Sequence, residues 1–297
     1  MRLIRAKGLA LIAIGALCAG AARVPDLLEL PPSRALAVTV NGTRATLVVD
    51  PDAPSAPILN PSLGRRLGLK PGLFGVEGQV GPVVVRGMTN VNRFDFGTGP
   101  IRRRTAVFER PFAQSDGAVG PGALPQPRIS FVLRPPVAGE RSYSLPLASL
   151  GREGLGTLVQ VGDRKVFASI HLGRDESVAT ASAGAAIAAQ HQGAFVGTPR
   201  ELTFRFGVLR PVRTLRLARS LLAGPVKLQV IEVRTADYGS VGSIRDTERD
   251  PSEIVVTART RRGPKPLQRI ALGRAAFASC SAILFDKPAK AIRLWCR

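Results

Sequence analysis

Short runs of alternating apolar and polar residues recur along the chain, separated by turn-forming residues. The clearest run covers 36–50, where two apolar stretches flank Asn41-Gly42. Asn-Gly between alternating apolar positions is a strong signal for a two-residue β-hairpin turn. A second run of the same form covers 157–172, with Gly162-Asp163 at the turn. The pattern therefore predicts two similar hairpins, one early and one near the middle of the chain.

Two further pairs of segments match in the same order. Gly99-Pro100-Ile101 matches Gly224-Pro225-Val226, and a β-prone run follows each. Val119-Gly120 matches Leu272-Gly273, and each leads to a strand-like stretch, ISFVL and AILFD. The second half is longer between these two pairs because it contains a charged stretch punctuated by Gly and Pro at 236–266. Three matches in one order predict an internal repeat with one polar insertion.

The composition supports a fold made of strands and turns. The chain has 31 Gly and 24 Pro among 297 residues, which favours many short elements over long helices. Its length is enough for one large domain or two smaller lobes with a sizeable core. We expect an all-β chain with an N-terminal lobe at 34–148 and a C-terminal lobe at 155–297 that carries the insertion at 236–266.

The N-terminus has the order of features typical of a secretory signal. Basic residues precede an apolar run at 9–17, and small residues follow at 19–21. This order predicts a signal peptide at 1–22 that is cleaved near Ala21. The alternative is a membrane anchor, but the apolar run is shorter than the ~20 residues that span a bilayer. The segment therefore predicts an exported, periplasmic protein.

Removal of the signal peptide leaves two cysteines, and an even count in an exported chain indicates a disulfide. A hairpin about Pro288 places Cys280 opposite Cys296, and it places Ala282 opposite Leu294. Directly opposed residues of an antiparallel pair are close enough for a disulfide. We expect the Cys280–Cys296 bond; two free thiols on neighbouring strands are the alternative.

The chain has a formal net charge of +21. The basic residues are scattered along the sequence, and aromatic residues make up only 5% of it, so no nucleic-acid-binding module is visible. We expect no nucleic-acid partner and some attraction to anionic surfaces of the cell envelope.

Residues 46–69 read TLVVDPDAPSAPILNPSLGRRLGL, an apolar strand that ends in Asp50 and is followed by a turn and an amphipathic segment. This stretch resembles the active-site element of retropepsin-like and pepsin-like aspartic proteases, where a strand delivers an Asp in Asp-Thr/Ser-Gly. Residues 116–124 resemble the family's hydrophobic-Gly element, which packs behind the catalytic loop. The resemblance implies two pseudo-symmetric β-barrel lobes, a peptide or protein ligand in the cleft between them, and no cofactor.

The resemblance also implies a pair of carboxylates that share one proton, one from each lobe. In the first half the triplet reads Asp50-Pro51-Asp52. Pro51 has no N–H and no hydroxyl, and Asp52 puts a charged side chain where the family has Gly. Asp50 and Asp52 are the candidate acids there, although adjacent loop carboxylates usually face solvent.

The second half has no acid at the matching position, because the repeat places His171 or Leu172 there. Asp175 is a candidate acid only if the loop is shifted, and it otherwise reads as a turn residue. His171 and His191 are the only histidines, and neither belongs to a G-x-S-x-G elbow or to a cluster of metal ligands. We interpret them as structural, with His171 hydrogen-bonded in the core.

The polar insertion contains one β-prone segment, Glu253–Arg259, with the sequence EIVVTAR. It resembles the short segment near the N-terminus of TonB-dependent outer-membrane receptors. Such a segment can add a strand to the sheet edge of a partner protein. The alternative is a short strand that packs on its own protein.

Three functional hypotheses follow from the sequence. The first is an exported aspartic-protease-like protein with a degraded catalytic pair, which binds peptides or associates with the envelope. The second is an active aspartic peptidase that uses Asp50 and a displaced Asp175. The third is a β protein that binds envelope polymers and resembles a protease only superficially.

Overall fold

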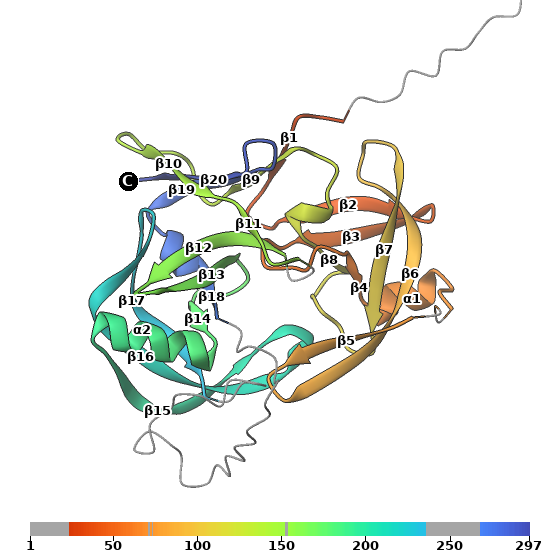
Figure 1. Ribbon diagram of the computed structural model, residues 1–297. Coiled ribbons are helices and arrows are strands. Elements are labelled where there is room, and N and C mark those ends of the chain that lie inside the picture. Colours follow the sequence, from red (N-terminus) through yellow and green to blue (C-terminus); the bar gives the residue numbers. More distant parts are fainter. Residues whose placement is uncertain (1–23, 71, 73, 152–153, 236–267) are drawn as a thin grey trace, which may run out of the picture.

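The computed structural model describes residues 24–70, 72, 74–151, 154–235 and 268–297. The expected signal peptide, the insertion at 236–266 and the Glu253–Arg259 segment lie outside the described residues. The described part is built mainly of strands, which confirms the all-β prediction, and Figure 1 shows the arrangement of its sheets. None of its helices has both the length and the apolar character needed to cross a membrane.

The first sheet has seven strands in the order β2-β3-β8-β4-β7-β6-β5, and β2 also pairs with β6. The β3·β8 and β4·β7 pairs are parallel, and the other pairs are antiparallel. The helix α1 (Pro61–Arg66) follows β4. The strands are β2 (Ala35–Val40), β3 (Thr43–Val49), β4 (Ile58–Leu59), β5 (Gly75–Val80), β6 (Val83–Asp95), β7 (Pro100–Phe108) and β8 (Gly117–Val119).

The second sheet has eight strands in the order β11-β12-β13-β18-β14-β17-β16-β15. Its parallel pairs are β13·β18 and β14·β17. The helix α2 (Ala181–His191) follows β14, and the Thr180 hydroxyl caps it by accepting the Ala183 N–H. The strands are β11 (Ala148–Ser149), β12 (Leu155–Val161), β13 (Arg164–His171), β14 (Val178–Ala179), β15 (Gly193–Thr203), β16 (Leu209–Ala223), β17 (Val226–Arg234) and β18 (Arg269–Gly273).

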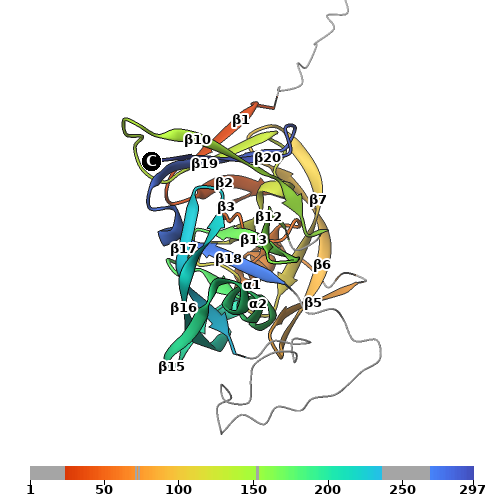
Figure 2. The ribbon, with the colours of Figure 1, turned by 60° about the vertical axis from the view of Figure 1, so that its left-hand side comes forward.

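A third sheet joins strands from both halves of the chain in the order β1-β9-β19-β20-β10, and Figure 2 shows it along one side of the other two. Its central pair, β9·β19, is antiparallel. The first strand, β1, precedes residue 34, where the N-terminal lobe was expected to begin, and pairs in parallel with β9. The strands are β1 (Leu27–Leu30), β9 (Arg128–Val132), β10 (Arg141–Pro146), β19 (Cys280–Asp286) and β20 (Ala291–Cys296).

Both predicted hairpins are present. Asn41 and Gly42 join β2 to β3 with φ values of 51° and 83°, the two positive angles that a two-residue hairpin turn of this kind requires. Gly162, with φ of 60°, begins the turn between β12 and β13. The sequence therefore placed these turns correctly because both depend on local backbone geometry.

The Cys280–Cys296 disulfide is present and joins the first residue of β19 to the last residue of β20. The register beyond it differs from the prediction, because Ala282 pairs with Trp295 and not with Leu294. A β-bulge between Cys280 and Ala282 inserts one residue and shifts the rest of the hairpin. The cysteine pairing was correct, and the register of the remaining strand was wrong by one residue.

A continuous apolar core lies under the three sheets. It includes fully buried residues of each sheet, among them Leu47, Leu215 and Phe285. Across the β9·β19 pair, the rings of Phe131 and Phe285 meet edge to face with centroids 5.8 Å apart. Burial of each large side chain stabilises the fold by ~1.5–3 kcal/mol relative to exposure. This core fixes the strand ends that carry the candidate site.

Candidate functional site

Two strand ends from different halves of the chain meet at the candidate site. Asp50 directly follows β3 and donates its N–H to the Val119 carbonyl of β8 over 3.0 Å. His171 is the last residue of β13, where it lies opposite Gly273 of the parallel strand β18. Each side chain therefore emerges at the end of a buried strand, beside a parallel partner.

The turn after β3 is closed by its own first residue. The Asp50 carboxylate accepts the N–H of Asp52 over 3.0 Å, and the Asp50 carbonyl accepts the N–H of Ala53 over 2.9 Å. Side-chain acceptance two residues along is the geometry of an Asx turn, and Pro51 presets the backbone angle between the two acids. The turn therefore holds Asp50 and Asp52 in a fixed relation to each other.

Two glycines allow the turns to pass close behind the strands. A Cβ at Gly120 would lie 2.7 Å from the Ala53 carbonyl oxygen, and a Cβ at Gly273 would lie 2.2 Å from the Asp175 carbonyl oxygen. Side chains are excluded at both positions because backbone atoms occupy the space. The two hydrophobic-Gly segments that the sequence singled out therefore lie directly against the two turns.

Asp52 is buried, with a relative exposure of 7%. Arg205 donates to its Oδ2 over 2.8 Å and also to its main-chain carbonyl, and Arg269 donates to its Oδ1. Burial would raise the pKa of the Asp52 carboxyl, but attraction to Arg205 and Arg269 outweighs burial and holds the pKa well below its usual range. Asp52 is therefore ionised and paired, and the expectation that it faces solvent was wrong because these two arginines come from distant parts of the chain.

His171 faces both acids of the first turn. Its Nδ1 lies 3.5 Å from Asp52 Oδ2 and 3.9 Å from Asp50 Oδ2, and its side chain is 15% exposed. Both distances exceed a normal hydrogen bond, and Nδ1 has no hydrogen-bond partner among the described residues. The interpretation of His171 as a hydrogen-bonded core histidine was therefore wrong, because at the end of β13 the ring meets carboxylates rather than backbone acceptors.

Arg174 adds a further positive charge next to the site. Its guanidinium lies 4.7 Å from the centroid of the Phe204 ring and donates to the Thr203 carbonyl over 3.1 Å. Burial lowers the pKa of Arg174, and attraction to Asp52 partly opposes this effect. The turn after β13 is thus attached to the tip of the β15–β16 hairpin.

The other sequence candidates lie apart from this cluster. Asp175 is a turn residue, as its alternative interpretation predicted; its side chain is 62% exposed and pairs with Arg274 over 2.8 Å. His191 lies at the end of α2, where its Nδ1 is 3.1 Å from the Arg219 carbonyl. Within the described part of the chain, no group of three or more His, Cys, Asp or Glu residues is arranged to hold a metal ion.

Sequence reasoning missed Arg205 and Arg269, the two partners of Asp52. They lie 153 and 217 positions from it along the chain. Neither stands in a motif, and both are lost among many scattered arginines. The burial of Asp52 points to them, but the sequence does not show this burial, because Asp52 follows the pattern of a loop residue.

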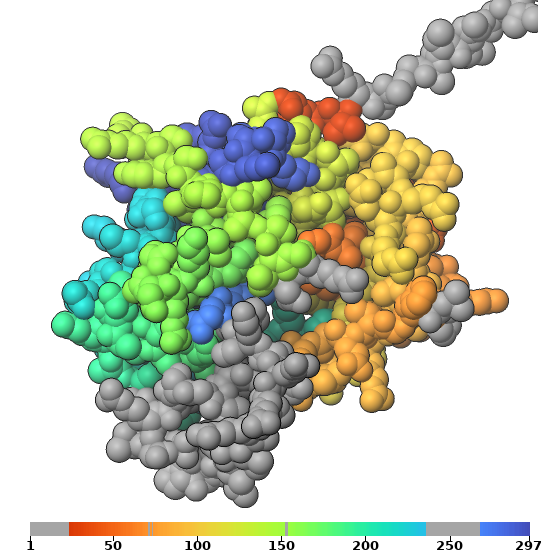
Figure 3. All heavy atoms as spheres, viewed as in Figure 1, coloured from red at the N-terminus to blue at the C-terminus, as the bar shows by residue number. Residues whose placement is uncertain are grey.

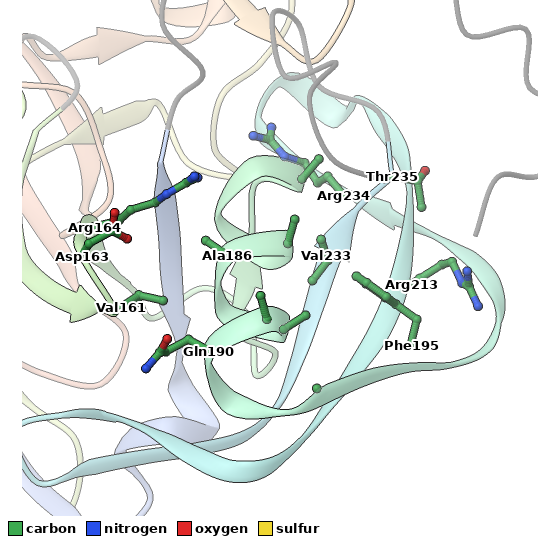
Figure 4. Close-up of a pocket in the computed structure, with 16 residues that line it drawn as sticks. Val161, Asp163, Arg164, Ala186, Gln190, Phe195, Arg213, Val233, Arg234 and Thr235 are labelled. Atoms are coloured by element: carbon green, nitrogen blue, oxygen red, sulfur yellow. The ribbon is translucent and has the colours of Figure 1, made fainter. Parts of the chain in front are cut away.

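Figure 3 shows a hollow between the first sheet, in orange, and the second half of the chain, with teal residues of the β15–β16 region at its bottom. A separate groove of about 520 Å³ runs along α2. In Figure 4, Ala186 and Gln190 of α2 lie in the middle of this groove, with Asp163 on one side and Phe195 on the other. The groove contains none of the residues around Asp50.

The arrangement of Asp50, Asp52 and His171 has to be interpreted from its own chemistry. No protein-family model matches the chain, and no curated protein was found to be similar to it.

Proposed function

We propose that this protein is a two-lobed, aspartic-protease-like protein of the periplasm that binds a peptide or protein between its lobes and does not cleave it. One observation carries the proposal: Asp50, from the end of β3, meets His171, from the end of β13. In the family that the sequence resembles, a carboxylate from each lobe occupies this place.

The order of the strands supports two related lobes. The first sheet runs β2-β3-β8-β4-β7-β6-β5, and the second runs β12-β13-β18-β14-β17-β16-β15 after its edge strand β11. In both, the second strand pairs in parallel with the third, and the fourth pairs in parallel with the fifth. A helix follows the fourth strand in each sheet. Such agreement is expected of a duplicated unit.

The same comparison supports the equivalence of Asp50 and His171. Asp50 lies beside the end of β8, next to Gly120, and His171 lies opposite Gly273 at the end of β18. The sequence repeat matches these two glycines, and both make room for the turn behind them. On this basis His171 stands where the second lobe of the family has its catalytic aspartate.

The chemistry of the site argues against an acid protease. That mechanism requires two carboxyls that share one proton, so that one activates water and the other donates. Asp52 is held ionised by two arginines, and an imidazole cannot replace the second carboxyl in a shared-proton pair. The alternative that uses Asp175 requires that exposed residue to leave Arg274 and reach Asp50.

A direct assay tests the loss of activity. Purified protein is incubated with a mixed peptide library between about pH 3 and pH 7, the range in which carboxyl pairs operate. We expect no cleavage above background, and the same result for Asp50→Asn. Cleavage at acid pH that Asp50→Asn abolishes would overturn the proposal.

The binding part of the proposal has its own test. The protein is panned against displayed random peptides, and each enriched peptide is then measured against Asp52→Asn and His171→Ala. We expect enriched peptides whose affinity falls in at least one of these variants. Failure to enrich any peptide, or peptides that bind both variants unchanged, would count against a ligand site between the lobes.

A second candidate function, attachment to an anionic envelope polymer, rests on a different surface. Arg93 of β6 and Arg102 of β7 lie directly opposite each other and are both exposed. Directly opposed like charges destabilise a sheet, and a polyanion would relieve the repulsion. Retention on immobilised polyphosphate that is lost in the Arg93→Gln/Arg102→Gln variant supports this candidate, and retention unchanged by the variant removes it.

A further inference from the structure

The tip of the β15–β16 hairpin, residues 204–208, reaches from the second half of the chain into the first. Figure 1 shows this hairpin extending towards β5. Phe206 is 6% exposed, and it packs with Val208 in a small apolar cluster whose other buried members all belong to the first half. Those members are Ile58, Val80, Val85, Ala106 and Phe108.

The pocket that receives the Phe206 ring is closely fitted to it. The ring centroid lies 4.5 Å from that of Phe108 and 5.3 Å from that of Phe112, in tilted and edge-on contacts. A Cβ at Gly78 would lie 2.7 Å from the Phe206 ring, so the absence of a side chain there makes room for the ring. The first half therefore presents an aromatic pocket that is completed by a residue of the second half.

An anionic group lies beside this pocket. Arg205, the residue before Phe206, donates to the Asp52 carboxylate over 2.8 Å, and its guanidinium also lies 5.7 Å from the Phe112 ring centroid. The first half thus offers two adjacent subsites, a carboxylate for a guanidinium and an apolar pocket for an aromatic ring. An Arg-Phe dipeptide occupies both.

The backbone of this dipeptide is strained. Phe206 has φ of 62°, a left-handed conformation that bulky residues rarely adopt, and Gly207 has φ of 65°. A non-glycine residue in this region costs on the order of 1–3 kcal/mol, which the surrounding contacts must offset. Release of the tip relieves this strain, which offsets part of the cost of leaving the two subsites.

We infer that the Asp52 carboxylate and the Phe206 pocket form a recognition site for a basic–aromatic dipeptide of a peptide or protein ligand, and that Arg205-Phe206 occupies this site in the absence of that ligand. The inference rests on the proposed function, because it names the chemistry of the ligand that binds between the lobes. Release of the hairpin tip exposes the site, and the fraction of released molecules sets the apparent affinity.

The test uses a fluorescent peptide, TFRFG, which has the sequence of residues 203–207. Its affinity is measured for the wild-type protein and for the Arg205→Ala/Phe206→Ala variant. Because the variant no longer fills the site, we expect it to bind the peptide at least ~10-fold more tightly than the wild type does. A peptide with Gln in place of Arg should lose this gain, and so should the triple variant that adds Asp52→Asn.

The matched control is Leu209→Ala/Arg216→Ala, which removes one apolar and one basic side chain from exposed positions of the same hairpin. It should bind TFRFG as the wild type does. If the double variant fails to fold, Arg205→Gln alone keeps the aromatic contacts and should still bind more tightly.

Equal affinities of TFRFG for the wild type and the variant overturn the inference, since the peptide then binds elsewhere. The absence of binding to a folded variant overturns it as well. These outcomes differ from failure of the proposed function. Peptides that are enriched by panning but have no basic–aromatic pair leave the proposed function standing and remove only this inference.

Discussion

The turn that follows β3 and the turn that follows β13 both pass behind a parallel strand, but they place their acids in opposite environments. In the first turn Asp52 is buried and contacts Arg205 and Arg269, both from the second half of the chain. In the second turn Asp175 is exposed and pairs with Arg274, which lies beside the same turn. The first acid therefore connects the two halves, whereas the second is satisfied locally.

The difference shows how a buried charge can connect the two halves of the chain. Two partly buried guanidiniums converge on the buried Asp52 carboxylate, which would be costly to leave unpaired. Any movement that separates the hairpin tip from the first turn breaks the Arg205–Asp52 pair and leaves Asp52 with Arg269. The exposed pair of the second turn imposes no such condition, because water replaces either partner at little cost.

The largest effect is expected for Asp52→Asn. Asp52→Asn removes the negative charge that faces Arg205 and Arg269, and removal of one partner from a buried charge network destabilises proteins by about 3–5 kcal/mol. The free energy of unfolding measured by urea titration should fall by this amount at neutral pH. A loss below about 1 kcal/mol would show that solvent compensates the arginines and that the contact is not buried in solution.

The effect of Asp52→Asn should depend on pH. The pKa of Asp52 is lowered in the folded protein, so its stabilising contribution is complete above the ordinary pKa of an Asp and is lost as the pH falls through the lowered value. Below about pH 4 the wild type should therefore lose stability faster than the variant. Urea midpoints at a series of pH values measure this, and a gap that stays constant with pH contradicts it.

Glycine-to-alanine substitutions compare how closely the backbone of each turn packs against the parallel strand beside it. A Cβ at Gly273 would overlap backbone atoms of Asp175 and Glu176, at 2.2 and 2.3 Å, and a Cβ at Gly120 would lie 2.7 and 2.9 Å from the carbonyl oxygens of Ala53 and Pro54. Overpacking of this kind costs about 1–3 kcal/mol, and Gly273→Ala should be the more costly. Thermal unfolding of both variants tests the order. The control is Gly75→Ala, because its φ is not positive and a Cβ there would meet only the Gly87 carbonyl oxygen, at 3.8 Å.

The smallest effect is expected for Asp175→Asn. Exposed pairs contribute between about 0 and 1 kcal/mol, because water screens both charges. The variant should unfold within about 0.5 kcal/mol of the wild type at low salt, and at the same point in high salt. A loss comparable to that of Asp52→Asn would mean that the two turns do not differ as described.

Local signals in the sequence predicted the parts of the fold that local geometry determines. Asn41-Gly42 requires positive φ angles and gave the first hairpin, and the spacing of Cys280 and Cys296 about a central Pro gave the disulfide. The one-residue bulge after Cys280 was not predicted, because the hairpin keeps an apolar pattern in either register. The all-β class followed from the density of turn residues.

The candidate site was predicted only in part. The end of an apolar strand indicated Asp50, and the repeat placed His171 or Leu172 opposite it. The burial of Asp52 could not be predicted, because it depends on arginines that lie far away in the sequence and in no motif. The strained hairpin tip at Phe206 also has no local signal, since the aromatic pocket that holds it comes from the other half.

The third sheet affects the order in which the molecule can be completed during synthesis. The strand β9, with Ile129 and Phe131 buried, has β1 on one side and β19 on the other. A ribosome delivers β1 and β9 early, but β19 begins only at Cys280. Until then one edge of β9 has unpaired backbone groups next to apolar side chains, which is the kind of edge that invites pairing with other chains. The emerging chain therefore depends on its last strands to close a sheet that its first strands began.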